Sequence, residues 1–270
     1  MLRWRILSAL LGIPVLLAVA YLGGLYLATV VGVLIIIGTG EFIRLARAIR
    51  LQPHRLMTSL GGLSFLVGAY LSSRGLIRAD WLAPVLLAVV GVNLGLLVIT
   101  YPRYTLSDSA VGVFGSVYVG WLLSHLFLLR DLAPQGFDYL LLTLILTWST
   151  DTGAYFTGRA IGRRKLAPQV SPNKTLEGAL GGVAGSLLAA MLLYYYYKPV
   201  FPLELCLGLG ILVSILGQFG DLVESALKRL SGIKDSGHLI PGHGGVLDRF
   251  DSLLLTGPAV YYYLKWFVIG

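Results

Sequence analysis

Residues 214–251 read SILGQFGDLVESALKRLSGIKDSGHLIPGHGGVLDRFD, and here an apolar segment passes without a break into the most polar region of the chain. Asp221, Glu224 and Ser225 are spaced i, i+3, i+4, so a helix would place them on one face. Asp248 and Asp251 repeat the i, i+3 spacing where the next apolar segment begins. Two carboxylate-bearing helix ends therefore flank a loop rich in Lys, His and Gly.

The residue types of this region indicate a site for a divalent cation and a polyphosphate. Carboxylate oxygens are the ligands that Mg²⁺ prefers, and basic side chains beside a glycine-rich backbone suit phosphate. His238 and His243 have neither a thiolate partner nor the paired spacing of a zinc site. The region therefore favours magnesium over zinc.

The composition is that of a membrane protein. Of 270 residues, 56% are hydrophobic and 13% are charged, and the mean hydropathy is +0.80. Soluble domains carry about 25% charged residues. The net charge of +8 is therefore interpreted as membrane topology and contact with anionic headgroups, not as nucleic-acid binding. Cys206 is the one cysteine, which excludes a disulfide framework within the chain.

The apolar runs predict an all-α, polytopic helical bundle, because a spanning helix needs about 20 mostly apolar residues. Met1–Arg5 with the following run resembles a signal peptide but is interpreted as part of a retained first helix. Nine spans are expected: Ile6–Leu22, Leu25–Arg44, Met57–Ser73, Trp81–Thr100, Ala110–Leu129, Tyr139–Gly158, Leu176–Tyr197, Phe201–Gly220 and Ser252–Phe267.

The basic residues predict the orientation. With nine spans, 16 Lys and Arg residues fall on the side of the N-terminus and 5 on the opposite side. Cytoplasmic loops carry the excess of Lys and Arg, so the N-terminus and the polar loops are expected in the cytoplasm. A bacterial inner membrane is the expected location.

Two further segments carry chemistry. Asp151 interrupts an apolar span, and a carboxylate there is costly unless it is functional or paired. Lys174 lies in the loop Ser171–Gly178, which leads into a helix with Asn173 or Thr175 as its cap. Exposed N–H groups at a helix start, together with a Lys, suit a phosphate.

Several apolar spans contain regularly spaced glycines. Gly178 with Gly182, and Gly181 with Gly185, have the four-residue spacing that allows close helix approach. Such glycine-rich spans permit a homodimer without requiring one.

The chain is expected to have two regions. Residues 1–135 would form N-terminal transmembrane helices, a scaffold able to dimerise. Residues 136–270 would form a C-terminal catalytic region with its active site on the cytoplasmic side.

Residues 225–251 resemble the signature of the phosphatidate cytidylyltransferases (CDP-diacylglycerol synthases) in SALKR, KDSG, PGHGG and DRFD. Residues 151–155 and 171–178 also look like that family, so the resemblance covers about residues 145–270. It implies an enzyme that uses Mg²⁺, with one or two metal ions, to transfer CMP from CTP to phosphatidic acid. CDP-diacylglycerol and pyrophosphate would be the products.

The roles that we assign follow from the residues and the resemblance together. Asp221 and Asp248 would hold the metal, with Glu224, Ser225, Asp251 or Asp151 close to it. The phosphates would bind Lys174, Lys228, Arg229, Lys234 and Arg249, and the nucleotide pocket would be lined by His243, Gly244 and Gly245. Replacing Asp248 with Asn is expected to abolish turnover and leave the protein folded.

Two other functions stay open at this point. The nearer one is a sibling chemistry: a CTP-dependent kinase of lipid alcohols, which would release CDP instead of pyrophosphate, or a cytidylyltransferase for a different lipid phosphate. A cation-coupled transporter would use Asp151, Asp221 and Asp248 as ion ligands, but transporters place such groups near the bilayer midplane, whereas these cluster at one membrane face.

Overall fold

The computed structural model describes residues 12, 14–197, 202–237 and 244–269, which form almost entirely helix. They divide into two compact units. Unit 1 contains the chain up to Phe137 together with Leu227–Phe250, and unit 2 contains Asp138–Ala226 and Asp251–Gly270. Helices α9 and α10 contribute residues to both units, so the polar stretch Leu227–Phe250 packs with the N-terminal helices.

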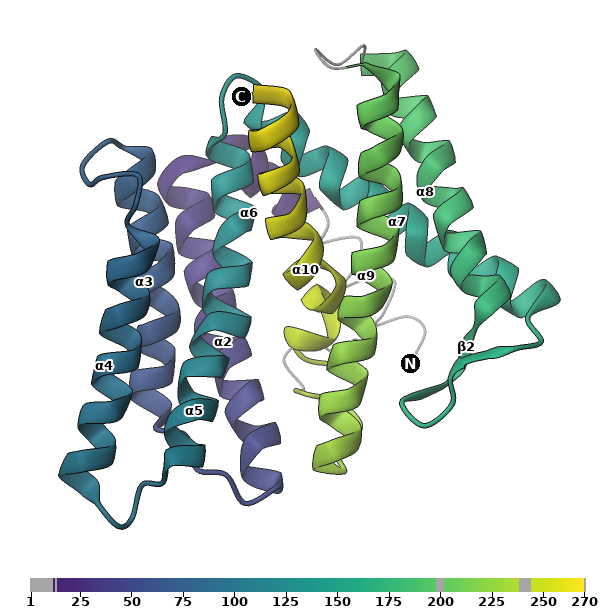
Figure 1. The fold of residues 1–270 in the computed structure, drawn as a ribbon. Helices are drawn as coiled ribbons and strands as arrows, with labels where there is room; N and C mark the ends of the chain where they lie inside the picture. The colour runs from purple at the N-terminus through teal and green to yellow at the C-terminus, as the bar shows by residue number, and fades with distance from the viewer. Residues whose placement is uncertain (1–11, 13, 198–201, 238–243, 270) are drawn as a thin grey trace. The chain divides into compact units, whose positions relative to one another are not determined.

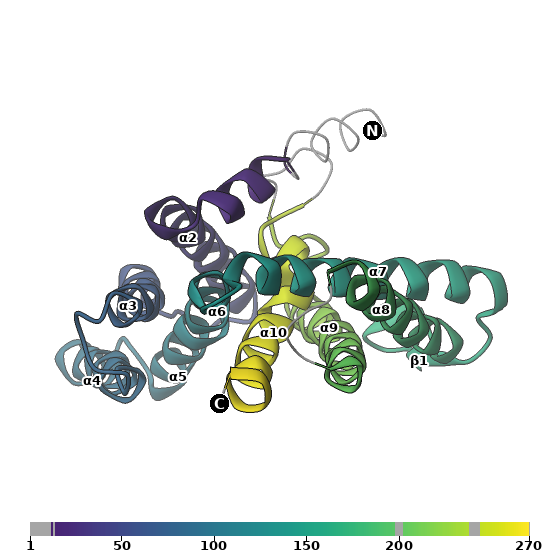
Figure 2. The same cartoon turned by 90° about the horizontal axis from the view of Figure 1, so that it is seen from above.

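Unit 1 is a bundle of antiparallel helices (Figures 1 and 2). The elements are α2 (Gly24–Ala48), α3 (Arg55–Ser73), α4 (Leu82–Thr100), α5 (Leu106–Gly115), a π-helical turn η1 (Ser116–Trp121) and α6 (Leu122–Asp131). Helix α3 packs against α2, η1 and α6. Ile35, Phe65, Leu123 and Phe127 are fully buried between them and form the apolar core of this unit.

The start of α5 shows how a polar terminus is satisfied in this unit. Thr105 Oγ1 accepts a hydrogen bond from the Asp108 N–H at 3.2 Å, and Asp108 Oδ2 accepts one from the Thr105 N–H at 3.0 Å. This reciprocal pair is a capping box, which satisfies two of the N–H groups that a helix start leaves open. The other Asp108 oxygen accepts the Gln52 N–H and so fixes the loop before α3.

Unit 2 contains α7 (Gly136–Ile161) from Asp138 onward, the strands β1 (Lys165–Ala167) and β2 (Ser171–Thr175), and α8 (Leu176–Tyr197). It also holds α9 (Leu203–Ser231) as far as Ala226, α10 (Leu247–Leu264) from Asp251 onward, and a final π-helical turn η2 (Lys265–Ile269). Helices α7 and α8 approach closely: Gly178 and Gly185 of α8 lie against Gly158 and Gly153 of α7. The close approach that the glycine spacing of α8 allows is therefore present in the structure.

The segment expected as a loop before α8 is a short antiparallel hairpin. Lys165 pairs with Thr175 and Ala167 with Ser171. The turn between them closes through a Val170 N–H to Ala167 carbonyl bond of 3.1 Å. Pro172 has no N–H to donate, and a two-stranded hairpin tolerates this because every strand in it is an edge.

The all-α polytopic fold is confirmed. Among the described residues, six helical segments are long and apolar enough to cross a membrane: α2, α3, α4, the continuous α5–η1–α6, α8 and α9. Helices α7 and α10 occupy the positions of two more predicted spans. The first predicted span, Ile6–Leu22, lies largely outside the described residues, although residues 14–22 are helical.

Candidate active site

Lys174 is held in place by the hairpin and by the start of α8. Thr175 caps α8, because its Oγ1 accepts the Gly178 N–H at 3.1 Å, so the cap is Thr175 and not Asn173. The Glu177 carboxylate accepts the N–H groups of Arg163 and Arg164 at 2.9 and 3.1 Å and ties the helix to the chain before β1. Lys174 is thus presented from a strand that is fixed at both ends.

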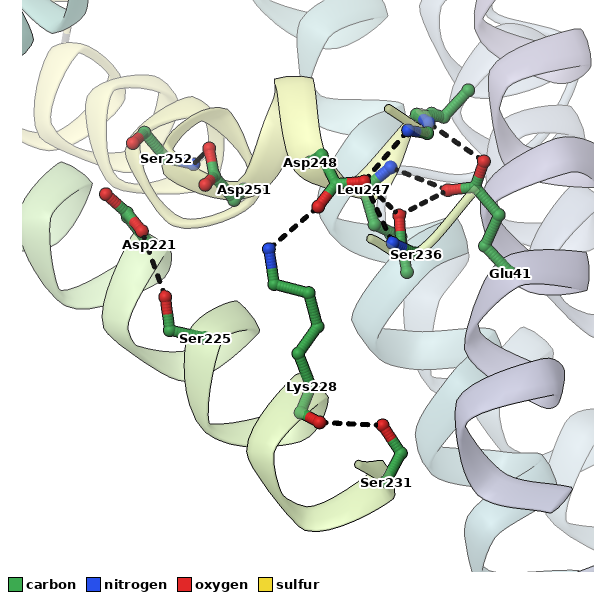
Figure 3. A network of polar contacts seen from close by, with 12 residues as sticks. Glu41, Asp221, Ser225, Lys228, Ser231, Ser236, Leu247, Asp248, Asp251 and Ser252 are labelled. Carbon is green, nitrogen blue, oxygen red and sulfur yellow. Dashed lines mark hydrogen bonds and ion pairs between the residues drawn. The ribbon is translucent and has the colours of Figure 1, made fainter. Parts of the chain in front are cut away.

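The Lys174 ammonium contacts a carboxylate of α9. Its Nζ lies 2.5 Å from Asp221 Oδ2, and both side chains are partly exposed. The other oxygen, Asp221 Oδ1, accepts the hydroxyl of Ser225 at 3.3 Å, as Figure 3 shows. The predicted i, i+4 face of α9 is therefore present, with Ser225 one turn beyond Asp221.

Three carboxylates of unit 2 act on one another electrostatically. The charges of Asp221 and Lys174 act on both Asp151 of α7 and Asp251 of α10, and Asp151 also acts on Asp251. Three acids around a single Lys leave an excess of negative charge if all are ionised. Such an arrangement is unfavourable unless a cation joins it, which is a mark of a binding site. Glu224 is also in this unit and is fully buried on α9.

Asp248 is the centre of a second polar network, in unit 1 (Figure 3). Its Oδ1 accepts the Lys228 ammonium at 2.7 Å. Its Oδ2 accepts three hydrogen bonds, from the Ser236 N–H at 2.9 Å, the Ser236 hydroxyl at 2.8 Å and the Gly245 N–H at 2.8 Å. The carboxylate therefore connects the end of α9, the loop after it and the start of α10.

These bonds keep Asp248 ionised. Burial alone would raise the pKa of this carboxyl, but the hydrogen bonds from Lys228, Gly245 and Ser236 and the charge of Lys228 outweigh burial and lower the pKa to about 2. At neutral pH the group is a carboxylate with one oxygen committed to the backbone. Oδ1 is held by the Lys228 ammonium, which could be exchanged for another cation, whereas Oδ2 is held by two backbone N–H groups and the Ser236 hydroxyl.

The glycines before Asp248 have a structural reason. Gly244 has a φ of +80°, a left-handed conformation that favours glycine, and a Cβ there would meet the Asp248 carboxylate at 2.7 Å. The predicted role of Gly244 and Gly245 in lining a nucleotide pocket is untested, and this turn is what the structure assigns to them. His243 lies outside the described residues.

The remaining predicted phosphate-binding residues lie near these networks along the chain. Arg229 at the end of α9, Lys234 in the following loop and Arg249 in the first turn of α10 all have exposed side chains in unit 1.

Glu41 is a site residue that the sequence reasoning missed. It lies in α2, is 3% exposed, and its carboxylate accepts the N–H groups of Val246 and Leu247, both at 2.9 Å. The signal that could have found it is the one that singled out Asp151, a lone carboxylate in an apolar span. Glu41 lies near the end of the predicted span Leu25–Arg44, and no role was predicted for it.

Three of the 16 basic residues counted on the side of the N-terminus line a cavity in unit 1. Arg44, Arg47 and Arg55 lie around a cavity of about 560 Å³, together with Glu41, Gly237 and isoleucines of α2. Guanidinium groups beside an aliphatic wall match the chemistry of an anionic lipid, whose phosphate is charged and whose chains are apolar.

The donor chemistry fits magnesium, although no complete cage is formed. Among the described residues, no three His, Cys, Asp or Glu side chains already surround one metal position. Mg²⁺ does not need one, because it is usually held by one or two carboxylates with water and substrate phosphates. In unit 2 the carboxylate of Asp221, with Asp151 and Asp251 acting on it, fits this chemistry, and in unit 1 the Oδ1 atom of Asp248 does.

Comparison with known proteins covers nearly the whole chain. Phosphatidate cytidylyltransferase of Bacillus subtilis is 34% identical over 267 residues, 98% of each chain. Proteins of the same name from Staphylococcus aureus and Synechocystis are 33% and 34% identical over 94% and 96% of this chain. The resemblance seen in residues 145–270 thus extends into the N-terminal half. The description "Cytidylyltransferase family" matches residues 3–267, and the chain belongs to that family.

Proposed function

We propose that this protein is a phosphatidate cytidylyltransferase, which transfers CMP from CTP to phosphatidic acid and yields CDP-diacylglycerol and pyrophosphate. The observation that carries the proposal is the similarity to proteins of that name over 98% of both chains. The carboxylates and lysines of α9, α10 and the hairpin support it, because a reaction between two phosphates needs groups of both kinds.

In the proposed reaction a phosphate oxygen of phosphatidic acid attacks the α-phosphorus of CTP. The bond from that phosphorus to the bridging oxygen breaks, and pyrophosphate leaves. The attacking phosphate is already anionic, so no strong general base is required. The main barrier is the approach of two anions, which cationic groups lower by neutralisation and positioning. When bound, Mg²⁺ would neutralise phosphate charge and align the attacking and leaving oxygens.

Each of the two proposed metal ligands is paired with a lysine. Lys174 contacts Asp221 at 2.5 Å and Lys228 contacts Asp248 at 2.7 Å. A lysine that gives up its aspartate to a cation becomes a free ammonium beside that cation. We propose that Lys174 and Lys228 then bind substrate phosphates, with Arg229, Lys234 and Arg249 as further phosphate contacts.

The proposed location is a bacterial inner membrane, with the N-terminus and the active site on the cytoplasmic side. CTP must arrive from water and phosphatidic acid from the leaflet, so the site has to lie at the interface. The Asp248 network is joined to the end of α2 that carries Arg44 and Arg47, next to Arg55 at the start of α3, as expected for a cytoplasmic end. The homodimer that the glycine-rich spans permit stays a prediction.

The first experiment uses purified protein in detergent with phosphatidic acid, Mg²⁺ and CTP labelled separately in the cytidine ring and in the γ-phosphate. We expect cytidine label in the lipid phase and γ-label in water as pyrophosphate. Transfer of the γ-label to a lipid alcohol would make the protein a kinase. If neither label moved with any lipid, the cation-coupled transporter would become the favoured function.

A further inference from the structure

Glu41 is a buried charge whose position in α2 needs an explanation. It is the single acidic residue of this 25-residue helix, and its side chain is removed from water. An ionised carboxylate in such a place is strongly unfavourable unless hydrogen bonds replace its hydration. The residues that supply those bonds come from the other end of the chain.

Glu41 caps α10 from another helix. Oε1 accepts the Val246 N–H and Oε2 accepts the Leu247 N–H, both at 2.9 Å. The N–H groups at a helix start have no partner within the helix, and a carboxylate is a strong acceptor for them. A residue of α2 therefore fixes the first turn of α10, in which Asp248 is the next residue.

A serine hydroxyl connects Glu41 directly to Asp248. Ser236 Oγ lies 3.0 Å from Glu41 Oε2 and 2.8 Å from Asp248 Oδ2 (Figure 3). A hydroxyl has one proton to donate, so the two carboxylates share it. Arg44, one turn after Glu41, also donates to the Ser236 carbonyl at 3.1 Å. Helix α2 thus holds both the side chain and the backbone of Ser236.

The backbone around Glu41 leaves no space for a side chain at two positions. A Cβ on Gly237 or on Gly245 would collide with the Glu41 carboxylate. The two chain segments that hydrogen-bond to Asp248, at Ser236–Gly237 and at Gly245, therefore both lie directly against the Glu41 carboxylate. Glycine at these two positions is what allows one carboxylate to bind the two segments together.

We infer that Glu41 is a positioning residue for Asp248. It holds Asp248 through Ser236 and the first turn of α10, so that the Oδ1 atom of Asp248 faces the side on which the proposed metal ion would bind. The inference rests on the proposed function, in which Asp248 is a metal ligand. Outer partners that orient a ligating carboxylate typically change metal affinity or activity by about 10- to 100-fold when removed.

The test is Glu41→Gln, with Asp108→Asn as the matched control. Glutamine keeps the size of the side chain, but its amide nitrogen opposes one of the two backbone N–H groups. Asp108 is likewise a buried carboxylate that caps a helix of unit 1, with 5% exposure, and none of its hydrogen bonds reaches the Asp248 network. Both variants lose a cap, and only one loses the support of Asp248.

Three quantities are measured for each variant: kcat/KM with its dependence on Mg²⁺, the unfolding temperature in detergent, and amide hydrogen exchange. Glu41→Gln is expected to lower kcat/KM about 10- to 100-fold, to raise the Mg²⁺ concentration needed, and to speed exchange at residues 245–247. Asp108→Asn is expected to speed exchange near Gln52 and Thr105 and to change kcat/KM less than about 3-fold. Equal effects of the two variants on kcat/KM and on its Mg²⁺ dependence would overturn the inference.

Ser236→Ala keeps the test decisive if Glu41→Gln does not fold. It removes the shared hydroxyl and leaves Glu41 and the Ser236 N–H bond in place. We expect Ser236→Ala to lower kcat/KM and to raise the Mg²⁺ concentration needed, as Glu41→Gln does. In the double variant the combined loss of kcat/KM should be smaller than the product of the two single losses, because both residues act through one connection. Full activity of Ser236→Ala, or strictly multiplicative losses, would contradict the inference. Wild-type protein without turnover would instead contradict the proposed function.

Discussion

Asp221 and Asp248 each hold a lysine, but they differ in how much of the fold depends on them. Asp248 Oδ2 accepts three hydrogen bonds from the loop and the start of α10. Among the described residues, Asp221 has hydrogen-bond or ion-pair contacts only with Lys174 and Ser225. Replacing Asp248 with Asn would therefore test the fold and the chemistry together, whereas Asp221 allows the two to be separated.

We predict that Asp221→Asn lowers turnover by at least about 100-fold and leaves the unfolding temperature unchanged or higher. The charge of Asp221 raises the free energy of ionised Asp151 and Asp251, so its removal relieves repulsion while it removes a proposed metal ligand. Turnover and thermal unfolding in detergent measure the two effects. Asp80→Asn, an exposed acid in the loop before α4, is the control. Undiminished turnover of Asp221→Asn would remove it from the metal site.

For single residues, the sequence identified candidate acidic side chains better than it identified the groups that contact them. Lone carboxylates in apolar segments are visible in a sequence, and Asp151 was found in this way. Glu41 is 195 to 206 residues away from the groups it binds, and no local pattern reports such a pairing. The pairs Lys174 with Asp221 and Lys228 with Asp248 could likewise be established only when the helices were placed in space.

At the scale of the element, hydropathy located the helices and missed the hairpin. The predicted spans Leu176–Tyr197 and Met57–Ser73 correspond closely to α8 and α3 (Arg55–Ser73), because the bilayer requires long apolar helices. The hairpin β1–β2 has three and five residues in its strands, too few for a periodic pattern. It is tied to the start of α8 by the Thr175 cap and by the Glu177 carboxylate, which accepts the N–H groups of Arg163 and Arg164.

The contact between α7 and α8 depends on glycine. A Cβ on Gly181 would collide with the Thr157 side chain, so we predict that Gly181→Ala destabilises the protein by about 1–3 kcal/mol, the typical cost of overpacking. Thermal unfolding in detergent measures this. Gly91→Ala in α4, where nothing lies within 4 Å, is the control and should be neutral or slightly stabilising, because alanine favours helix. A neutral Gly181→Ala would show that α7 and α8 separate at no cost.

At the scale of the whole molecule, the positions of charge in each unit bear on orientation. In unit 1, Arg44, Arg47 and Arg55 gather at the α2–α3 end, and Ser236 joins the Asp248 loop to that same end. Arg74 and Arg78 lie at the opposite end of α3, in the loop before α4. In unit 2, the hairpin end carries Arg163, Arg164 and Lys165. The 16 to 5 division of Lys and Arg predicts that the α2–α3 end and the hairpin face the cytoplasm.

Single cysteines in a Cys206→Ala background test this prediction, since Cys206 is the one native cysteine and is buried. Gln52 and Arg78 lie at opposite ends of α3, and Gln169 lies at the hairpin turn; all three are exposed. In intact spheroplasts, a membrane-impermeant maleimide should label Arg78→Cys, and should label Gln52→Cys and Gln169→Cys only after permeabilisation. The reverse pattern would place the α2–α3 end outside, away from CTP. Labelling of Gln52→Cys and Gln169→Cys from different sides would contradict the proposed active site, because Asp248 and Lys174 would then face different compartments.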